Sequence, residues 1–257
     1  MSDHELAARL ATQAGELLLG VRAELAGAAA EELKAAGDKR SHDFLLAALT
    51  AERPDDVVLS EEGPEEEAEP ARLSARRVWI VDPLDGTREF SELGRTDWAV
   101  HVALWQSGEL IAGAVALPAQ GDTLATPTVA APPAAPEIPR IVVSRTRPPA
   151  VALEVRDALN GVLVEMGSAG AKVASVVQGL SDVYVHAGGQ HEWDSAAPVA
   201  VARAAGLHTS RLDGSPLKYN QRDSKLPDLI VCRPEYADAV LAVTAGPRSG
   251  RSSSHRQ

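Results

Sequence analysis

The stretch Trp79-Ile80-Val81-Asp82-Pro83-Leu84-Asp85-Gly86-Thr87 joins a short apolar run to two closely spaced aspartates. The apolar run predicts a buried β-strand. Pro83 has a fixed φ and biases Asp82 towards extended geometry, so the chain is expected to turn directly after the strand. Such a turn lets the carboxylates of Asp82 and Asp85 converge, with the carbonyl of Leu84 between them.

Further acidic residues stand beside other predicted elements. Glu61 follows the β-rich run at 57–59 after Ser60, and Asp194 stands at the start of an expected helix. Carboxylates placed after buried strands are held at one edge of a sheet, where open α/β sheets bind ligands. Oxygen ligands of high negative charge suit a hard cation, Mg²⁺ above all, and not zinc. Because Gly86 and Thr87 offer N–H groups suited to phosphate oxygens, the combination predicts metal-assisted phosphate chemistry.

The same residues also have simpler interpretations. An Asp-Pro-x-Asp-Gly string is often only a capped turn, and Asp194 is well suited to N-cap the helix that follows it. The acidic run from Glu65 onward is interpreted as a solvated loop. We interpret His186 and His191 as ordinary polar surface residues.

The first half of the chain is expected to pack two helices on a sheet. Apolar spacing predicts a helix from Leu6 to Leu25, and Ser41 is a competent N-cap for a second helix that ends before Pro54. Short β-rich runs predict strands, the last two forming a hairpin at Gly108, over residues 57–59, 78–81, 98–105 and 110–117.

The five prolines of residues 127–139 predict an extended connector. We therefore expect an N-terminal α+β metal-site domain over residues 1–130, a C-terminal α/β substrate-binding domain over 131–244 and a disordered tail over 245–257. The second half alternates strands and helices, an α/β layered pattern, with strands at 141–143 and 182–186 and helices at 149–159, 168–180 and 194–205.

Composition excludes several classes of function. The chain has 257 residues, of which 45% are hydrophobic, enough for a sizeable core. Its net charge of -11 would repel nucleic acid polymers and anionic membrane surfaces. Cys232 is the single cysteine, and the chain has neither a secretory leader pattern nor an apolar run long enough to span a bilayer. We therefore expect a cytoplasmic location.

Three motifs together resemble those of a known family. Glu61-Glu62, the WIVDPLDGT string at 79–87 and WDSAAP at 193–198 occur in the order typical of the inositol monophosphatase superfamily of Mg²⁺-dependent, lithium-sensitive phosphatases. The resemblance spans nearly the whole chain. Within the superfamily, REF at 88–90 and AGGQHEWDSAAP at 187–198 are most similar to the CysQ branch, and there to actinobacterial members.

The resemblance implies a fold, an activity and a metal site. The implied fold is an αβαβα sandwich, and the implied activity is that of a 3'(2'),5'-bisphosphate nucleotidase, which hydrolyses 3'-phosphoadenosine 5'-phosphate (PAP) to AMP and phosphate in sulfate assimilation. A metal-activated water would attack phosphorus directly, oriented by Asp38 and Thr87, with Glu61 as a further catalytic residue. Two Mg²⁺ ions, with a third left open, would be held by Glu61, Asp82, the Leu84 carbonyl, Asp85 and Asp194.

The resemblance also implies how the substrate is held. SRTR at 144–147 and GSAGAK at 167–172 are similar to segments that contact the nucleotide in the CysQ branch. The implied substrate contacts are Gly86, Thr87, Arg88, Ser144, Arg145, Arg147, Ser168, Lys172 and Asp194. The expected partner is thus a small molecule, PAP, with 3'-phosphoadenosine 5'-phosphosulfate (PAPS), other phosphate monoesters and a homodimer left open.

Two alternative functions are weighed against PAP hydrolysis. The same site could act as an inositol monophosphatase or a fructose-1,6-bisphosphatase, a reading that REF at 88–90 disfavours. The carboxylates could instead belong to a non-catalytic domain that binds divalent cations. A purely structural site has no need of Asp38 and Thr87, which favours the enzyme.

Overall fold

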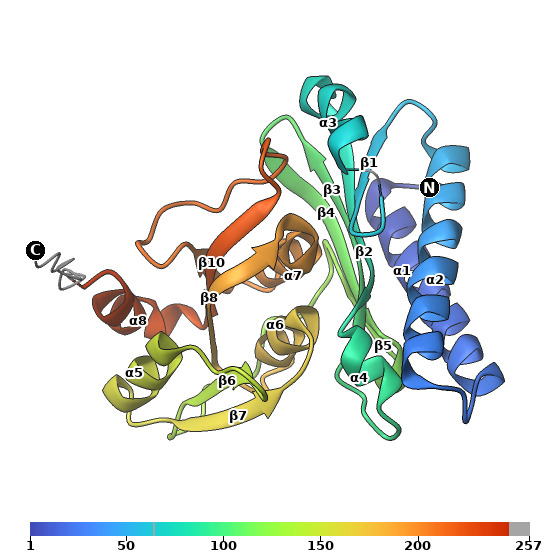
Figure 1. Cartoon of the computed structure of the whole chain (residues 1–257). Coiled ribbons are helices and arrows are strands. Elements are labelled where there is room, and N and C mark those ends of the chain that lie inside the picture. Colours follow the sequence, from blue (N-terminus) through green and yellow to red (C-terminus); the bar gives the residue numbers. More distant parts are fainter. Residues whose placement is uncertain (64, 247–257) are drawn as a thin grey trace, which may run out of the picture.

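The computed structural model of the chain describes residues 1–63 and 65–246 and contains two five-stranded sheets (Figure 1). The first sheet has the order β1-β2-β3-β4-β5, from strands Val57–Ser60, Arg77–Asp85, Ala99–Gln106, Glu109–Leu117 and Asp122–Ala125. The second has the order β7-β6-β8-β10-β9, in which β6 to β10 are Arg140–Ser144, Val162–Met166, Val183–His191, His208–Ser210 and Lys225–Cys232.

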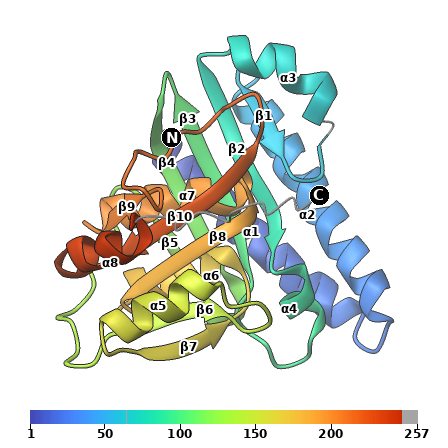
Figure 2. The ribbon, with the colours of Figure 1, turned by 60° about the vertical axis from the view of Figure 1, so that its left-hand side comes forward.

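Helices form three layers around these sheets, as Figures 1 and 2 show. The first layer, α1 (Asp3–Glu24) and α2 (Ala30–Glu52), covers the outer face of the first sheet. The middle layer, α6 (Ala169–Val177) and α7 (Glu192–Ala204), lies between the sheets, and α5 (Ala150–Ala158) and α8 (Ala237–Thr244) cover the outer face of the second sheet. The expected αβαβα sandwich is therefore confirmed. The short helices α3 (Glu65–Ser74), α4 (Thr87–Ser91), η1 (Pro118–Gln120) and η2 (Pro234–Tyr236) complete the described elements.

The position of strand β2 explains why residues 78–81 are all apolar and do not alternate with polar residues. Val78 and Ile80 face the core between the two sheets, whereas Trp79 and Val81 face α1 and α2. Both faces of the strand are therefore buried, which removes the polar positions that a half-exposed strand would carry.

The second helix begins earlier than expected. Ser41 is not its N-cap, because α2 starts at Ala30 and Ser41 lies buried inside it, where its hydroxyl donates a hydrogen bond to the Pro83 carbonyl at 2.7 Å. The preceding residues are mostly Ala, Glu, Leu and Lys, which are strong helix formers. Ser41 therefore serves as a tertiary contact between α2 and the turn after β2.

Other elements differ from the sequence-based expectations. The loop interpretation of Glu65 onward is wrong, since residues 65–74 form α3, whose composition again favours a helix. The strand expected at 182–186 extends to His191. Strands β5, β7, β9 and β10 and helix α8 were not predicted; β5, β7 and β9 are short.

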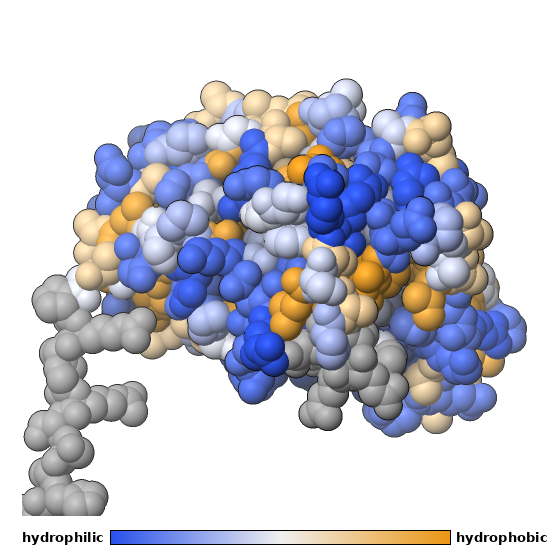
Figure 3. Space-filling model, turned by 90° about the horizontal axis from the view of Figure 1, so that it is seen from above, coloured by the Kyte–Doolittle hydropathy of each residue, from blue (hydrophilic) through white to orange (hydrophobic). Residues whose placement is uncertain are grey.

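The proposed division into two domains stays a prediction. Each sheet takes its strands from one side of the connector at 127–139, but one apolar cluster joins the two sheets through α6 and α7. Most of the tail, residues 247–257, lies outside the described residues. Among the described residues we find no helix with the length and apolar character needed to cross a membrane. The face seen in Figure 3 is mainly hydrophilic, with hydrophobic residues in small groups.

Gly113 allows α7 to pack closely on the first sheet, which gives a first prediction. A Cβ at this position would lie 2.6 Å from the Ala200 Cβ and 3.1 Å from the Ala197 carbonyl oxygen. We expect Gly113→Ala to lower the free energy of unfolding by ~1–3 kcal/mol, measured by urea denaturation, because α7 would have to move.

Gly20→Ala is the matched control. Gly20 lies inside α1 with no heavy atom within 4 Å of a Cβ, so this change should raise stability by ~0.5–1 kcal/mol. A Gly113→Ala protein with the wild-type urea midpoint would contradict the close packing.

Candidate metal centre

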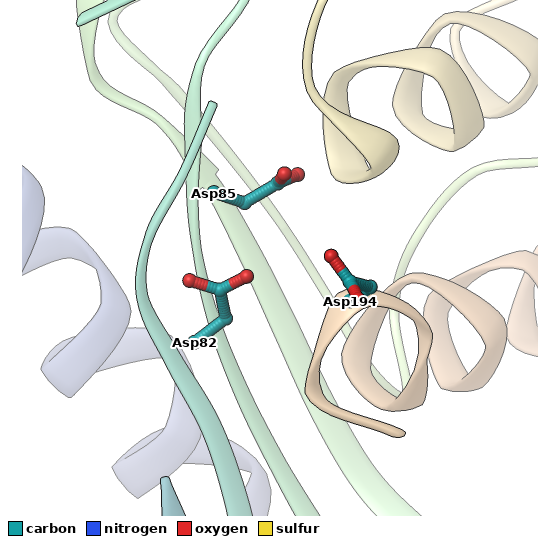
Figure 4. A group of neighbouring side chains, drawn as sticks. All are labelled: Asp82, Asp85 and Asp194. Atoms are coloured by element: carbon teal, nitrogen blue, oxygen red, sulfur yellow. The ribbon is translucent and has the colours of Figure 1, made fainter. Parts of the chain in front are cut away.

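Three aspartates from two elements converge at one place. Asp82 and Asp85 lie at the end of β2, and Asp194 lies in the first turn of α7. Each offers a carboxylate oxygen, and these oxygens lie within 4.8 Å of one another (Figure 4). Asp82 and Asp85 are buried and Asp194 is half-buried. The structure therefore brings these three residues together as expected, whereas Glu61, which was expected to join them, is exposed and is not part of this group.

An irregularity in β2 makes the convergence possible. Residues three apart on a regular strand point to opposite faces of the sheet. Between Asp82 and Asp85, however, the pairing of β2 with β3 shifts its register. The Leu84 N–H donates to Asp82 Oδ1 at 3.0 Å within this shift. The two carboxylates therefore face the same side.

Asp194 does not N-cap its helix, contrary to the sequence-based expectation. The N-cap is His191, and Asp194 is the third helical residue, whose carboxylate accepts a hydrogen bond from the His191 N–H at 2.6 Å. Strand β8 runs directly into α7, so the helix begins two residues before Asp194. This hydrogen bond fixes the Asp194 carboxylate at the start of the helix.

Asp85 is held by the beginning of α6. Its carboxylate accepts hydrogen bonds from the Ser168 hydroxyl at 2.5 Å and from the N–H groups of Ala169 and Gly170 at 3.1 and 2.5 Å. Burial alone would raise its pKa, but the hydrogen bonds and the His101 imidazole outweigh burial and hold the pKa of Asp85 at about 2. Asp85 is therefore a fixed negative charge.

The neighbouring carboxyl groups are held in a crowd of like charges. Desolvation and then the charge of Asp194 raise the pKa of Glu61 to about 7, although Glu61 is more exposed than the three aspartates. Burial and then the charge of Glu61 raise the pKa of Asp82. Burial and then the charge of Asp85 raise the pKa of Asp194 to about 6. These carboxyl groups cannot all be ionised at low cost, because their negative charges repel one another. A divalent cation, which prefers oxygen ligands, would offset this repulsion.

Thr87 connects α2 with the turn after β2. Its hydroxyl lies 3.1 Å from the Leu84 carbonyl and 3.4 Å from Asp38 Oδ1. Desolvation and then the charge of Glu62 raise the pKa of Asp38 to about 6. Gly86 precedes Thr87 as the N-cap of α4 with φ of 84°. The Thr87 hydroxyl therefore contacts both Asp38 and Leu84.

The residues expected to bind substrate fall into two groups. Ser144 and Arg147 line a pocket of about 350 Å³ together with His186 and residues 187–189. Arg145, by contrast, is bound to the carboxylates of Glu89 and Glu92, each at 2.7 Å. These two ion pairs join the loop after β6 to α4, beside the turn that carries Asp85.

The remaining expected contacts are already engaged within the protein. Arg88 is exposed and lies 3.2 Å from Glu92. Ser168 caps α6 in addition to holding Asp85. Lys172 is buried, and its ammonium donates to the carbonyls of Gly167 and Ser168 at 2.9 and 2.6 Å. Their roles as substrate contacts stay predictions.

Sequence reasoning missed two residues at this site. His101, on β3, lies beside Asp85, and Glu89 receives Arg145. The available signal for His101 was a lone polar residue in the apolar run 98–105. Glu89 carried no signal beyond its place in the REF string.

Comparisons with known proteins identify the family of the chain. The sequence matches the inositol monophosphatase family over residues 3–130 and 137–245. It is 52% identical over 258 residues to the 3'-phosphoadenosine 5'-phosphate phosphatase of Mycobacterium leprae, covering 95% of this chain and 93% of the relative. The enzyme of the same name from Mycobacterium tuberculosis is 54% identical over 241 residues, covering 90% and 89%.

Solved structures show the same architecture. CysQ from Bacteroides thetaiotaomicron superposes with a TM-score of 0.75 at 27% identity, covering 89% of this chain and 96% of that one. Inositol monophosphatase II from Staphylococcus aureus superposes with a TM-score of 0.77 at 20% identity, covering 96% and 97%, and shows the fold alone. By its matched family, its relatives and its fold, the chain belongs to the inositol monophosphatase family.

Proposed function

We propose that the chain is a Mg²⁺-dependent phosphatase that removes the 3'-phosphate of PAP to give AMP and phosphate. The observation that carries the chemistry is the convergence of Asp82, Asp85 and Asp194. The substrate is supported by the mycobacterial relatives, which are named as PAP phosphatases and match nearly the whole chain at 52–54% identity. The experiment that tests the proposal compares phosphate release from PAP, PAPS, inositol 1-phosphate and fructose 1,6-bisphosphate, with and without Mg²⁺.

The oxygen donors that the structure provides fit a Mg²⁺ site. The proposed ligands are the carboxylates of Glu61, Asp82, Asp85 and Asp194 and the carbonyl of Leu84. All are oxygens, as Mg²⁺ prefers, and we propose two ions. When bound, the ions would activate the attacking water and offset the charge that develops on the leaving oxygen.

Asp38 and Thr87 are proposed to orient the attacking water. The Thr87 hydroxyl contacts both Asp38 and the Leu84 carbonyl, so it lies between α2 and the proposed ligands. The pKa of Asp38, raised to about 6 chiefly by desolvation, suits a group that accepts a proton near neutral pH. Gly86 and Thr87 are proposed to contact the phosphate through their N–H groups.

The second phosphate and the nucleoside are proposed to bind the other half of the chain. The pocket lined by Ser144 and Arg147 opens beside the loop after β6, which Arg145 ties to α4. We keep Arg88, Arg145, Ser168, Lys172 and Asp194 as proposed contacts. To bind a phosphate, Arg145 would have to break its ion pair with Glu89 or Glu92. Lys172 would have to break one of its hydrogen bonds to a backbone carbonyl.

Asp82→Asn should separate activity from stability. We expect kcat/KM for PAP to fall at least ~100-fold, because a proposed ligand between the other carboxylates is lost. In EDTA, however, the variant should melt at or above the melting temperature of the wild type. The change removes a buried carboxylate that is repelled by its acidic neighbours, and the Asn side-chain oxygen can still accept the hydrogen bond from the Leu84 N–H. Activity within a few fold of wild type at saturating Mg²⁺ would overturn the ligand assignment.

The metal-free protein should lose stability as pH rises from about 4 to about 7. The carboxyls of Glu61 and Asp194 have raised pKa values, about 7 and about 6, so the folded state binds their protons more tightly than the unfolded state does. Their contribution to stability is therefore present at low pH and is lost as pH rises through this window. Thermal melts across the window should show a smaller loss with saturating Mg²⁺, and identical slopes with and without Mg²⁺ would argue against binding at this site.

Arg147→Ala should affect the nucleotide more than a simple phosphate ester. We expect its KM for PAP to rise ~10-fold, the loss of about one charge-assisted hydrogen bond, and its KM for inositol 1-phosphate to change less than ~2-fold. Arg156→Ala, an arginine on α5 paired with Asp157, is the control and should change neither. Equal effects of Arg147→Ala on both substrates would exclude a nucleotide-specific role.

A further inference from the structure

His101 is a fully buried polar side chain between apolar residues of β3. It lies on β3 directly opposite Asp82 in the pairing of β2 with β3. Its neighbours on the same face, Ala99 and Ala103, are small and belong to the core between the sheets. Burial of an imidazole is costly unless its nitrogens are used, so its contacts indicate what it does.

The two ring nitrogens face two different parts of the proposed site. Nδ1 lies 3.0 Å from the carbonyl oxygen of Trp193, the residue before Asp194, and because a carbonyl only accepts, Nδ1 is the donor. Nε2 lies 3.3 Å from Asp85 Oδ2, within ion-pair distance but without an aligned hydrogen bond among the described residues. Asp82 Oδ2 lies 3.9 Å from Nδ1.

The start of α6 is shaped to make room for this ring. A Cβ at Gly170 would lie 1.9 Å from His101 Nε2, so any side chain there would displace the imidazole. The N–H of the same Gly170 donates to Asp85 at 2.5 Å. The end of β2, the start of α6 and the start of α7 therefore all meet on His101.

We propose that His101 is a positioning residue for the metal centre: its ring lies between the Asp85 carboxylate, 3.3 Å from Nε2, and the Trp193 carbonyl at the start of α7, and so sets the separation of Asp85 and Asp194. The ring is rigid, so the distance between its two contacts cannot drift as it could through a flexible side chain. Carboxylates that bind metals depend on such outer partners, whose loss typically weakens metal affinity ~10–100-fold. This inference rests on the proposed function of the same site.

The test replaces His101 while keeping the core filled. His101→Leu is close in volume and removes both polar contacts, and His101→Gln keeps one donor but cannot reach both partners. Val102→Ala, on the same strand but facing α1 and α2, is the control for loss of packing. Calorimetric titration with Mg²⁺, melting in EDTA and steady-state kinetics with PAP are measured for each.

We expect the Mg²⁺ Kd to rise ~10-fold or more in His101→Leu and by an intermediate factor in His101→Gln, with kcat at saturating Mg²⁺ reduced and KM for PAP within ~2-fold of wild type. Val102→Ala should melt at a lower temperature but keep the wild-type Mg²⁺ Kd, which separates positioning from packing. A folded His101→Leu with the wild-type Mg²⁺ Kd overturns the inference. Should His101→Leu not fold, a wild-type Kd in His101→Gln overturns it equally.

Measurements on the wild-type protein distinguish a failure of the proposed function from a failure of the proposed role of His101. Wild type that binds no Mg²⁺ and releases no phosphate from PAP would overturn the proposed function and this inference with it. Wild type that does both, beside variants that bind Mg²⁺ equally well, would overturn the role of His101 alone.

Discussion

Carboxylates brought together away from water repel one another, and here the buried Asp82 and Asp85 come from the end of β2 and the half-buried Asp194 comes from the start of α7. Burial of nearby apolar side chains does not offset this repulsion. The carboxylates therefore have to be held in place by hydrogen bonds from fixed parts of the fold. The N–H groups at the start of α6 and the His191 N–H at the start of α7 supply that hold. The pKa values of Asp82 and Asp194 are nevertheless raised, so a divalent cation bound here would offset the remaining repulsion.

The five layers explain how groups so distant in sequence stay fixed. One apolar cluster fills the space between the sheets around α6 and α7, and another anchors α1 and α2 on the opposite face of the first sheet. The residues of the proposed site lie where β2, α2, α6 and α7 approach one another, so movement of one element disturbs several contacts. Polar contacts across these elements, such as Ser41 with the Pro83 carbonyl, and Arg145 with Glu89, then fix the local geometry.

The sequence predicts the parts of the site whose signals are local. Asp82 follows an apolar run directly, Asp85 comes three residues later, and the structure brings both close to Asp194. The αβαβα sandwich, which is also confirmed, was implied by the family resemblance and not by a local signal. The predicted start of α2 was wrong because Ser41 is a residue type that often caps helices. In the structure its hydroxyl instead donates a hydrogen bond to the Pro83 carbonyl. His101 and Glu89 could not be identified, since their partners lie 92 and 56 residues away and no local pattern encodes such pairing.

Asp85 belongs to the half of the chain before the proline-rich connector, whereas the groups that hold it, Ser168 to Gly170, come after it. Asp194 also lies beyond the connector. A chain cut within 127–139 would thus yield two fragments, neither of which contains a complete set of carboxylates. Each fragment would also expose one side of the apolar layer that α6 and α7 occupy. Catalysis by such a pair would report directly on their reassembly, which makes this protein a natural scaffold for fragment complementation.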